Sequence, residues 1–155
     1  MITTFETLAP GQSIEGPKFA VSRETIKAFC DASLDYNPLH LDDDYMKGSF
    51  GKTSFGGIIM HGMNNFGLIT RMLTDWAYAA NGALRRLETR WLVPVKPGDT
   101  IQPFGKIKAK RETAKSQWVV VDGGEQPARR DGRDRRGAGR VSAGPAGIMI
   151  PGRRR

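Results

Sequence analysis

The chain has 155 residues, enough for one domain with a single buried core and too few for two ordinary domains. Its formal net charge is +8, but residues 122–155 contain nine arginines and four acidic residues, so residues 1–121 carry a net charge of only +3. This distribution argues against a nucleic-acid-binding or membrane-binding surface over the body of the protein.

Cys30 is the only cysteine, so no intrachain disulfide can form and nothing indicates an oxidising compartment. Because Cys30 shares a helical face with Ile26 and Phe29, we interpret it as a buried core residue and not as a catalytic thiol. The first eleven residues lack the basic and apolar regions of a signal peptide, and no apolar run approaches membrane-spanning length. The sequence therefore predicts a soluble cytoplasmic protein.

The first third of the chain predicts one strand and two short helices. A strand over residues 12–21 follows a Pro-Gly turn, and Ser22 can cap a helix that ends near Asp35. Pro38 has no amide hydrogen and disfavours helical backbone at Asn37, so residues 35–40 form a shaped loop. Asp42 can then cap a second short helix.

A long helix is predicted from about His61, because apolar residues recur at helical spacing until Asn81 and Gly82 stop the pattern. Three strands follow, over residues 87–93, 101–109 and 116–121. Strands that follow one long helix predict an α+β domain, in which an antiparallel sheet curls around that helix.

Asp35 and His40 are the candidate catalytic residues. They lie five residues apart on the loop that Pro38 bends, so both side chains can face one cleft. A carboxylate and an imidazole suit general acid-base chemistry, because each can exchange a proton with a bound water near neutral pH. The alternative interpretation is structural, since Asp and Asn beside a proline commonly form turns and cap helices.

The segment Asp-Tyr-Asn-Pro-Leu-His at residues 35–40 resembles the D-x-N-P-[LIV]-H signature of the MaoC-like dehydratases, which include the (R)-specific enoyl-CoA hydratases. Two further stretches support the likeness. Phe55 with Ile-Ile-Met-His-Gly-Met at residues 58–63 is similar to the start of the family's central helix, and residues 91–99 resemble the next strand and its P-V-x-x-G-D turn. The likeness covers roughly residues 5–121.

The resemblance implies a hot-dog fold over residues 1–121, in which an antiparallel sheet wraps one long central helix. It also implies reversible hydration of a trans-2-enoyl-CoA thioester to a 3-hydroxyacyl-CoA, with no metal or redox cofactor and with the acyl-CoA as substrate. Asp35 and His40 would hold the attacking water, and an amide near Gly62 would stabilise the charge on the thioester oxygen. Asn37 would shape the substrate loop, and His61 would be structural. A homodimer is expected, with each cleft completed across the interface.

Three positions depart from the family pattern. Leu34 stands where a glycine commonly precedes the aspartate, Met46 where a small residue is common, and Gly67 where many hydratases have a serine. These changes leave the acid-base pair intact but leave the length and shape of the acyl group open. Two other functions on the same fold remain as alternatives, a thioesterase and a non-catalytic acyl-CoA-binding subunit. The D-x-N-P-x-H segment favours hydration over both.

Residues 122–155 form an Arg/Gly-rich tail with almost no apolar periodicity, and no strand is predicted there. Codons exist for residues 125–145 that, read one base later, encode SNQRGETVATGEARVASAPA, which resembles the expected last strand of the family. We therefore hypothesise a frameshift near residues 122–125, which sequencing the DNA across this point tests. The alternative is an arginine-rich arm that binds nucleic acid or another anionic surface, which the lack of aromatic residues for base stacking disfavours.

Overall fold

The computed structural model describes residues 4–48, 55–127 and 141–150. Within these ranges four helical segments and seven strands follow one another along the chain. They are β1 (Ser13–Glu15), β2 (Phe19–Ala20), α1 (Arg23–Ser33), the 3₁₀ turn η1 (Pro38–His40), α2 (Asp43–Lys47), α3 (Gly62–Tyr78), β3 (Ala83–Arg86), β4 (Thr89–Trp91), β5 (Thr100–Glu112), β6 (Gln117–Pro127) and β7 (Val141–Ile150).

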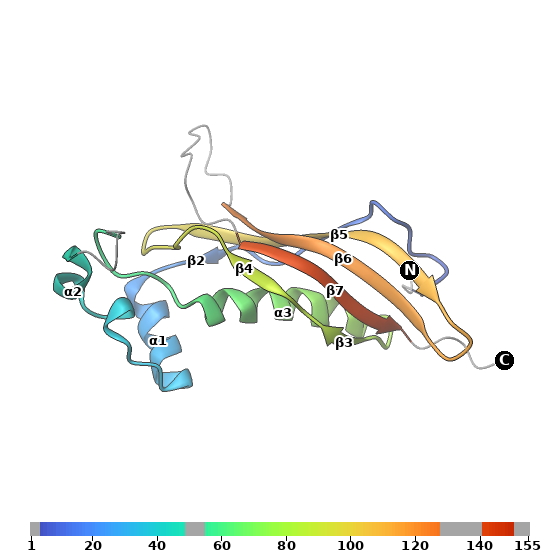
Figure 1. Ribbon diagram of the computed structural model, residues 1–155, viewed down its shortest axis with the longest axis horizontal. Coiled ribbons are helices and arrows are strands. Elements are labelled where there is room, and N and C mark those ends of the chain that lie inside the picture. Colours follow the sequence, from blue (N-terminus) through green and yellow to red (C-terminus); the bar gives the residue numbers. More distant parts are fainter. Residues whose placement is uncertain (1–3, 49–54, 128–140, 151–155) are drawn as a thin grey trace.

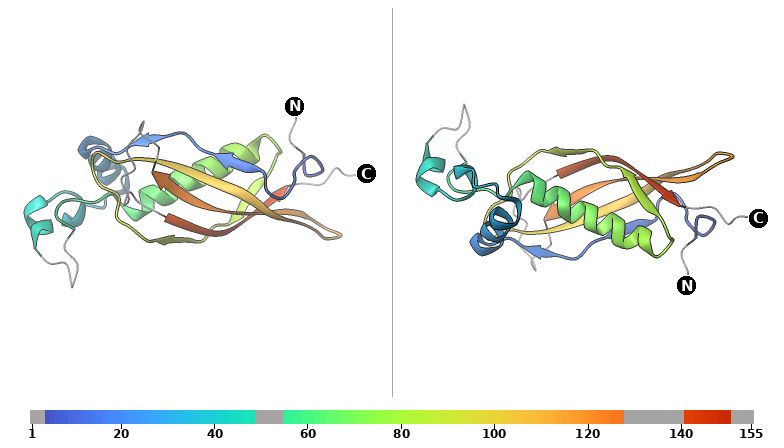
Figure 2. Two further views of the ribbon diagram at one scale, coloured as in Figure 1. Left: turned by 90° about the horizontal axis from the view of Figure 1, so that it is seen from above. Right: turned by 90° about the horizontal axis from the view of Figure 1, so that it is seen from below.

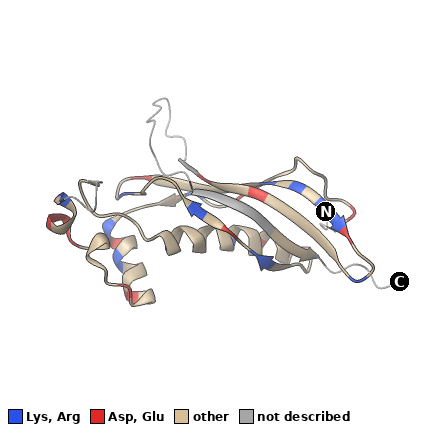
Figure 3. Cartoon of the chain, in the orientation of Figure 1, with Lys and Arg blue, Asp and Glu red and all other residues tan. Residues whose placement is uncertain are grey.

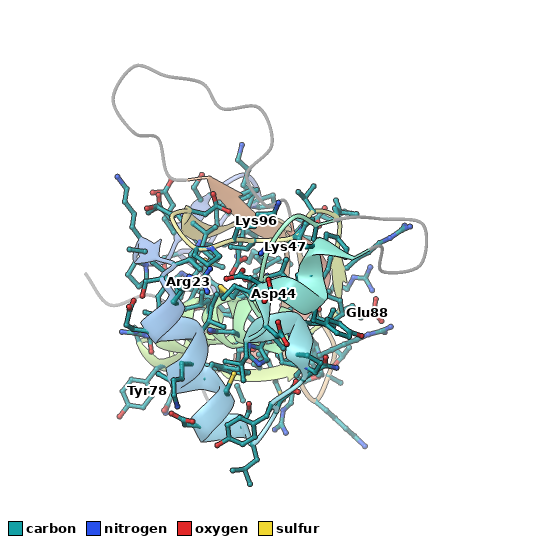
Figure 4. The ribbon with its side chains drawn as sticks, turned by 90° about the vertical axis from the view of Figure 1, so that its left-hand side faces the viewer. Arg23, Asp44, Lys47, Tyr78, Glu88 and Lys96 are labelled. Carbon is teal, nitrogen blue, oxygen red and sulfur yellow. The ribbon has the colours of Figure 1, made fainter. Side chains whose placement is uncertain are left out.

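The strands form one antiparallel sheet in the order β1-β5-β6-β7-β3, with β2 also paired to β5 and β4 to β7. Helix α3 runs along one face of this sheet, as Figures 1 and 2 show. Helices α1 and α2 lie together at one end of the molecule, and Figure 4 looks onto that end, with Arg23 of α1 and Lys47 of α2 labelled. The predicted α+β arrangement of a sheet around one long helix is therefore confirmed.

The core lies between α3 and the sheet, and side-chain alternation on the strands explains it. On β5, Ile101 and Ile107 face inward and are buried, whereas Lys106 between them is exposed. Ile69 and Leu73, one turn apart on α3, pack in the same cluster as Ile107. Ile101 belongs to a second cluster, with Ile26 of α1 and Met46 of α2. Figure 3 shows that α3 carries few charged residues, while α1 and α2 carry many. Among the described residues, no helix is long and apolar enough to cross a membrane.

The predicted caps are present. Ser22 accepts a hydrogen bond from the amide of Thr25, and the Thr25 hydroxyl accepts one from the amide of Ser22, which completes a capping box at the start of α1. Asp42 accepts hydrogen bonds from the amides of Asp44 and Tyr45 at the start of α2. The cap at Ser22 fixes the start of α1, and the cap at Asp42 fixes where the chain leaves the loop that holds the candidate site.

Two predicted strands differ in the structure. Residues 12–21 form two separate strands, β1 and β2, and the backbone at Gly16 between them lies close to Pro103 and Met72. Of residues 87–93 only Thr89–Trp91 form a strand, β4, and β3 precedes it at Ala83–Arg86, where no strand is predicted. Strands β1 and β2 both pair with β5, and β3 and β4 both pair with β7.

The prediction that regular structure stops at Val121 is wrong for the described part of the tail. Strand β6 continues to Pro127, and Val141–Ile150 forms β7 between β6 and the β3–β4 edge. Backbone groups can form a ladder with little help from a side-chain pattern, and Pro145 is tolerated because it has no Cα partner in either neighbouring strand. Residues 128–140 and 151–155 of the predicted tail lie outside the described residues, and the frameshift remains a hypothesis.

Glu125 of β6 is an ionisable residue buried within this sheet. It lies opposite Pro103 on the side of β5 that faces the core, and its side chain is only 1% exposed. Neither of its carboxylate oxygens has a hydrogen-bond partner among the described residues. Burial raises the pKa of Glu125 from 4.5 to about 8, because the charged form has lost its water. The buried carboxyl therefore costs stability at neutral pH.

Candidate active site

The candidate site begins where α1 ends. Leu34 caps the helix with a φ of 60° and a ψ of 21°, so the next residue, Asp35, turns away from the helix axis. The Asp35 carboxylate accepts a hydrogen bond from the amide of Asn37 at 3.2 Å, and the Asn37 side-chain oxygen accepts one from the amide of Leu39 at 3.1 Å. These two short bridges shape the loop, as predicted for Asn37, whose contact with substrate stays a prediction.

Leu34 occupies a backbone conformation that suits glycine, the residue expected there from the family pattern. A residue with a Cβ in the left-handed region costs roughly 1–2 kcal/mol of stability. Glycine removes this cost, but part of the gain is lost because glycine has greater freedom in the unfolded chain. We expect Leu34→Gly to raise the free energy of unfolding by up to about 1 kcal/mol, measured by urea denaturation. Leu34→Ala keeps the Cβ and is the control, because the Leu34 side chain is 75% exposed and contributes little packing. A glycine variant that is less stable than the alanine variant would contradict backbone strain at Leu34.

His40 lies at the end of η1, and its side chain is 7% exposed. Its Nδ1 lies 2.7 Å from the carbonyl oxygen of Ile59, which can only accept a hydrogen bond, so Nδ1 must carry the proton. In the neutral ring the lone pair is therefore on Nε2. The carbonyl of Ile59 thus selects the tautomer of His40 in which Nε2 is the basic nitrogen.

His61, the residue that caps α3, lies directly against this pair. Its ring stacks on His40 with centroids 3.5 Å apart, and it contacts the Phe29 ring of α1 at 4.7 Å. Its Nε2 donates to the backbone carbonyl of Asp35 at 3.2 Å and lies 3.7 Å from the Cys30 sulfur. Burial, helped by the charge of His40, holds the pKa of His61 below its usual value. His61 therefore stays neutral at neutral pH and supports the site.

The structure brings Asp35 and His40 together, although Asp35 begins the loop and His40 ends it. One donor atom from each of Asp35, His40 and His61 lies within 4.8 Å of the other two. A carboxylate oxygen and a ring nitrogen that lie within 4.8 Å of each other are close enough for one water to hydrogen-bond to both. Asp35 is half exposed while His40 is buried, so water can reach the pair from the Asp35 side.

The same three residues have the donor types of a metal site, but their geometry opposes one. A metal ion binds an imidazole nitrogen in the plane of the ring, about 2 Å from the atom. The His40 and His61 rings are stacked 3.5 Å apart with only 21° between their planes, so one ion cannot lie in the plane of both rings at bonding distance. The arrangement therefore favours a bound water over a shared metal ion.

Gly62, the first residue of α3, lies beside His61 and beneath the indole of Trp91. A Cβ at Gly62 would meet two atoms of the Trp91 ring at 2.8 Å, so only glycine fits there. The carbonyl of His61 accepts from the amides of Asn64 and Asn65. Among the described residues, the amides of Gly62 and Met63 are therefore the donors left at this end of the helix, where the helix dipole is positive.

Comparison with known proteins shows which family the chain belongs to. A family model described as "MaoC like domain" matches residues 5–126. The chain belongs to the MaoC-like domain family. It is 31% identical over 116 residues to the protein MaoC of Klebsiella aerogenes, which covers 73% of this chain and 32% of that protein. It is also 31% identical over 97 residues to the (R)-specific enoyl-CoA hydratase of Rhodospirillum rubrum, covering 63% of this chain and 64% of the relative.

Solved structures agree with the fold expected for the MaoC-like family. The (R)-hydratase from A. caviae superposes with a TM-score of 0.74 at 23% identity, over 94% of this chain and 99% of that one. The hot-dog fold predicted from the sequence is therefore confirmed. The chain spans 32% and 64% of the lengths of the two curated relatives above, so it corresponds to only part of either protein.

Proposed function

We propose that this MaoC-like chain is a hydro-lyase that reversibly adds water across the double bond of a trans-2-enoyl-CoA thioester to give a 3-hydroxyacyl-CoA. The observation that carries the proposal is the 4.8 Å grouping of Asp35 with His40, whose tautomer the carbonyl of Ile59 fixes. The likeness to an (R)-specific enoyl-CoA hydratase supports the same reaction.

In the proposed reaction, Asp35 and His40 hold one water between them. One of the pair removes a proton from this water as its oxygen bonds to C3 of the enoyl group, and the other delivers a proton to C2. The sum is the addition of one water molecule, and the reverse sequence dehydrates the 3-hydroxyacyl thioester. The proposed reaction uses no redox cofactor, because no electrons leave the substrate, and no metal, because Asp35 and His40 supply both proton transfers.

The negative charge that forms on the thioester oxygen needs a hydrogen-bond donor. The amide of Gly62 suits this role, because it is a free donor at the positive end of α3, next to His61 and hence next to the acid-base pair. A preorganised donor of this kind typically contributes about 10²- to 10³-fold in kcat. Gly62 thus completes the proposed catalytic set.

Large apolar side chains around the site support the proposal of a homodimer. Several residues at the end of α1 and on the loop after it, at the start of α3, and on or just after β4 are more than 45% exposed, namely Leu34, Tyr36, Met63, Trp91 and Leu92. Such clustering is typical of surfaces that another molecule covers, either a second copy or the acyl-CoA. A cytoplasmic location forms part of the same proposal, and the buried Cys30 is compatible with it.

Crotonyl-CoA separates hydration from the two alternative functions. Loss of absorbance of the conjugated thioester without release of free thiol is the expected result for the purified chain. Release of free thiol would instead indicate a thioesterase, and binding without either change would indicate an acyl-CoA-binding subunit. The assay runs on the full chain and on a chain whose codons 122–155 are shifted by one base, so that a defect of the tail is not mistaken for a different function.

A further inference from the structure

Trp91 of β4 is joined to the start of α3 by a contact that the reaction outlined above does not use. Its indole nitrogen donates a hydrogen bond to the carbonyl oxygen of Gly62 at 2.9 Å. The ring also occupies the space that a side chain at position 62 would need, since a Cβ there would lie 2.8 Å from two ring atoms. Residues 29 positions apart in the sequence therefore fit each other closely.

The contact connects Trp91 to the acid-base pair by a short path. Gly62 follows His61, and the His61 ring stacks on His40 at 3.5 Å. The Trp91 side chain nevertheless remains 48% exposed, and its neighbour Leu92 is 52% exposed. The indole is therefore held at its nitrogen beside the Gly62 backbone while about half of the residue stays exposed.

We propose that Trp91 is a positioning residue for the hydration reaction, which holds the first turn of α3 so that the Gly62 amide points at the thioester oxygen. This inference rests on the proposed function. The hydrogen bond from the indole fixes the Gly62 carbonyl, and the ring prevents the helix start from moving toward β4. Displacing a catalytic donor by about 1 Å can cost on the order of 10²-fold in rate, so a residue that prevents this displacement affects kcat.

The first test replaces Trp91 by phenylalanine, which keeps a ring and removes the N–H. We expect Trp91→Phe to lower kcat for crotonyl-CoA by about 10-fold, with little change in KM and in the urea midpoint of unfolding. Trp118→Phe is the matched control. It removes an indole hydrogen bond of 2.7 Å to Ser116 at the start of β6, in the hairpin that joins β5 and β6, and should leave kcat unchanged.

The second test asks whether the two residues act together. Gly62→Ala should lower both kcat and the urea midpoint, because the new methyl group collides with the indole. Adding Trp91→Ala should restore the urea midpoint of the Gly62→Ala chain, since it removes the colliding ring, while kcat stays about 10²-fold low. A double variant whose midpoint is lower than that of either single variant would overturn the inferred packing.

The outcomes distinguish this inference from the proposed function. A wild-type chain that does not hydrate crotonyl-CoA in either reading frame of the tail would overturn the proposed function and this inference with it. An active wild type together with an equally active Trp91→Phe variant would overturn the inference alone. A Trp91→Phe variant with a raised KM and an unchanged kcat would also overturn it, because that pattern shows binding without positioning.

Discussion

Asp35→Asn is expected to lower kcat for crotonyl-CoA hydration by roughly 10²- to 10⁴-fold, because the amide keeps the size of the carboxylate but cannot exchange a proton. The substitution preserves the side-chain oxygen that accepts a hydrogen bond from the amide of Asn37, so the loop should keep its shape. KM should change little, since the proposed role of Asp35 is in the chemical step. Steady-state kinetics on the purified variant measure both constants.

Asp75→Asn provides the control for this experiment. Asp75 is an exposed carboxylate on α3 that pairs with Arg71 at 3.5 Å, and its replacement should leave kcat unchanged. The double variant of Asp35→Asn with His40→Asn should be about as slow as either single variant, because the two residues act as one unit on a single water. Full turnover by the Asp35→Asn chain would remove Asp35 from the mechanism.

The second large effect concerns Glu125 and the dependence of stability on pH. Below pH 4.5 the carboxyl is protonated in both the folded and the unfolded chain. Above this pH the unfolded chain loses the proton, but the folded chain keeps it until about pH 8, where burial has placed the pKa of Glu125. The free energy of unfolding is therefore expected to fall by up to about 4 kcal/mol as pH rises from 4.5 to 8.

His61 acts in the opposite direction, because its pKa is held below the usual 6.5 in the folded protein. The unfolded chain binds a proton at this residue below pH 6.5 and the folded chain does not, so stability is lost as pH falls. The two effects oppose each other between about pH 4.5 and 6.5. The loss due to Glu125 should therefore be clearest between pH 6.5 and 8 in the wild type, measured by urea midpoints across this range.

Glu125→Gln removes the titrating proton, so its urea midpoint should stay flat between pH 6.5 and 8. Asp122→Asn changes an exposed carboxylate on the same strand and should leave the wild-type slope in place. Glu125→Ser installs the residue that the hypothesised frameshift places at this position with the codons chosen above, and it should raise the midpoint at pH 8. A slope that survives Glu125→Gln would show that another group causes it.

The sequence is sufficient to predict that Asp35 and His40 lie close together, because they are near in sequence and Pro38 bends the loop between them. Their catalytic role stays a prediction. The contacts of His61 with Asp35 and of Trp91 with Gly62 join residues 26 and 29 positions apart. These depend on how α3 packs against α1 and β4, which no short pattern encodes. The histidine before Gly62 was visible as a helix cap but not as a partner of His40.

Strand β7 shows where prediction from a side-chain pattern fails. Side-chain periodicity predicts a strand only when alternate residues face a core, and residues 141–147 are mostly small, with a proline among them. The backbone still pairs with β6 and with the β3–β4 edge, and Ile148 then reaches the core. Strand β7 therefore follows from the unfilled hydrogen-bonding edge of its neighbours more than from its own sequence.

The three rings of Phe29, His61 and His40 come from α1, the start of α3 and η1, and they form a continuous column. Each ring is anchored to a different element, so a tilt of α1 would be passed through the column to the His40 imidazole. Shrinking Phe29, which is not one of the proposed catalytic residues, should therefore change the position of the His40 ring from a distance. The placement of His40 thus depends on the docking of a helix outside the signature loop.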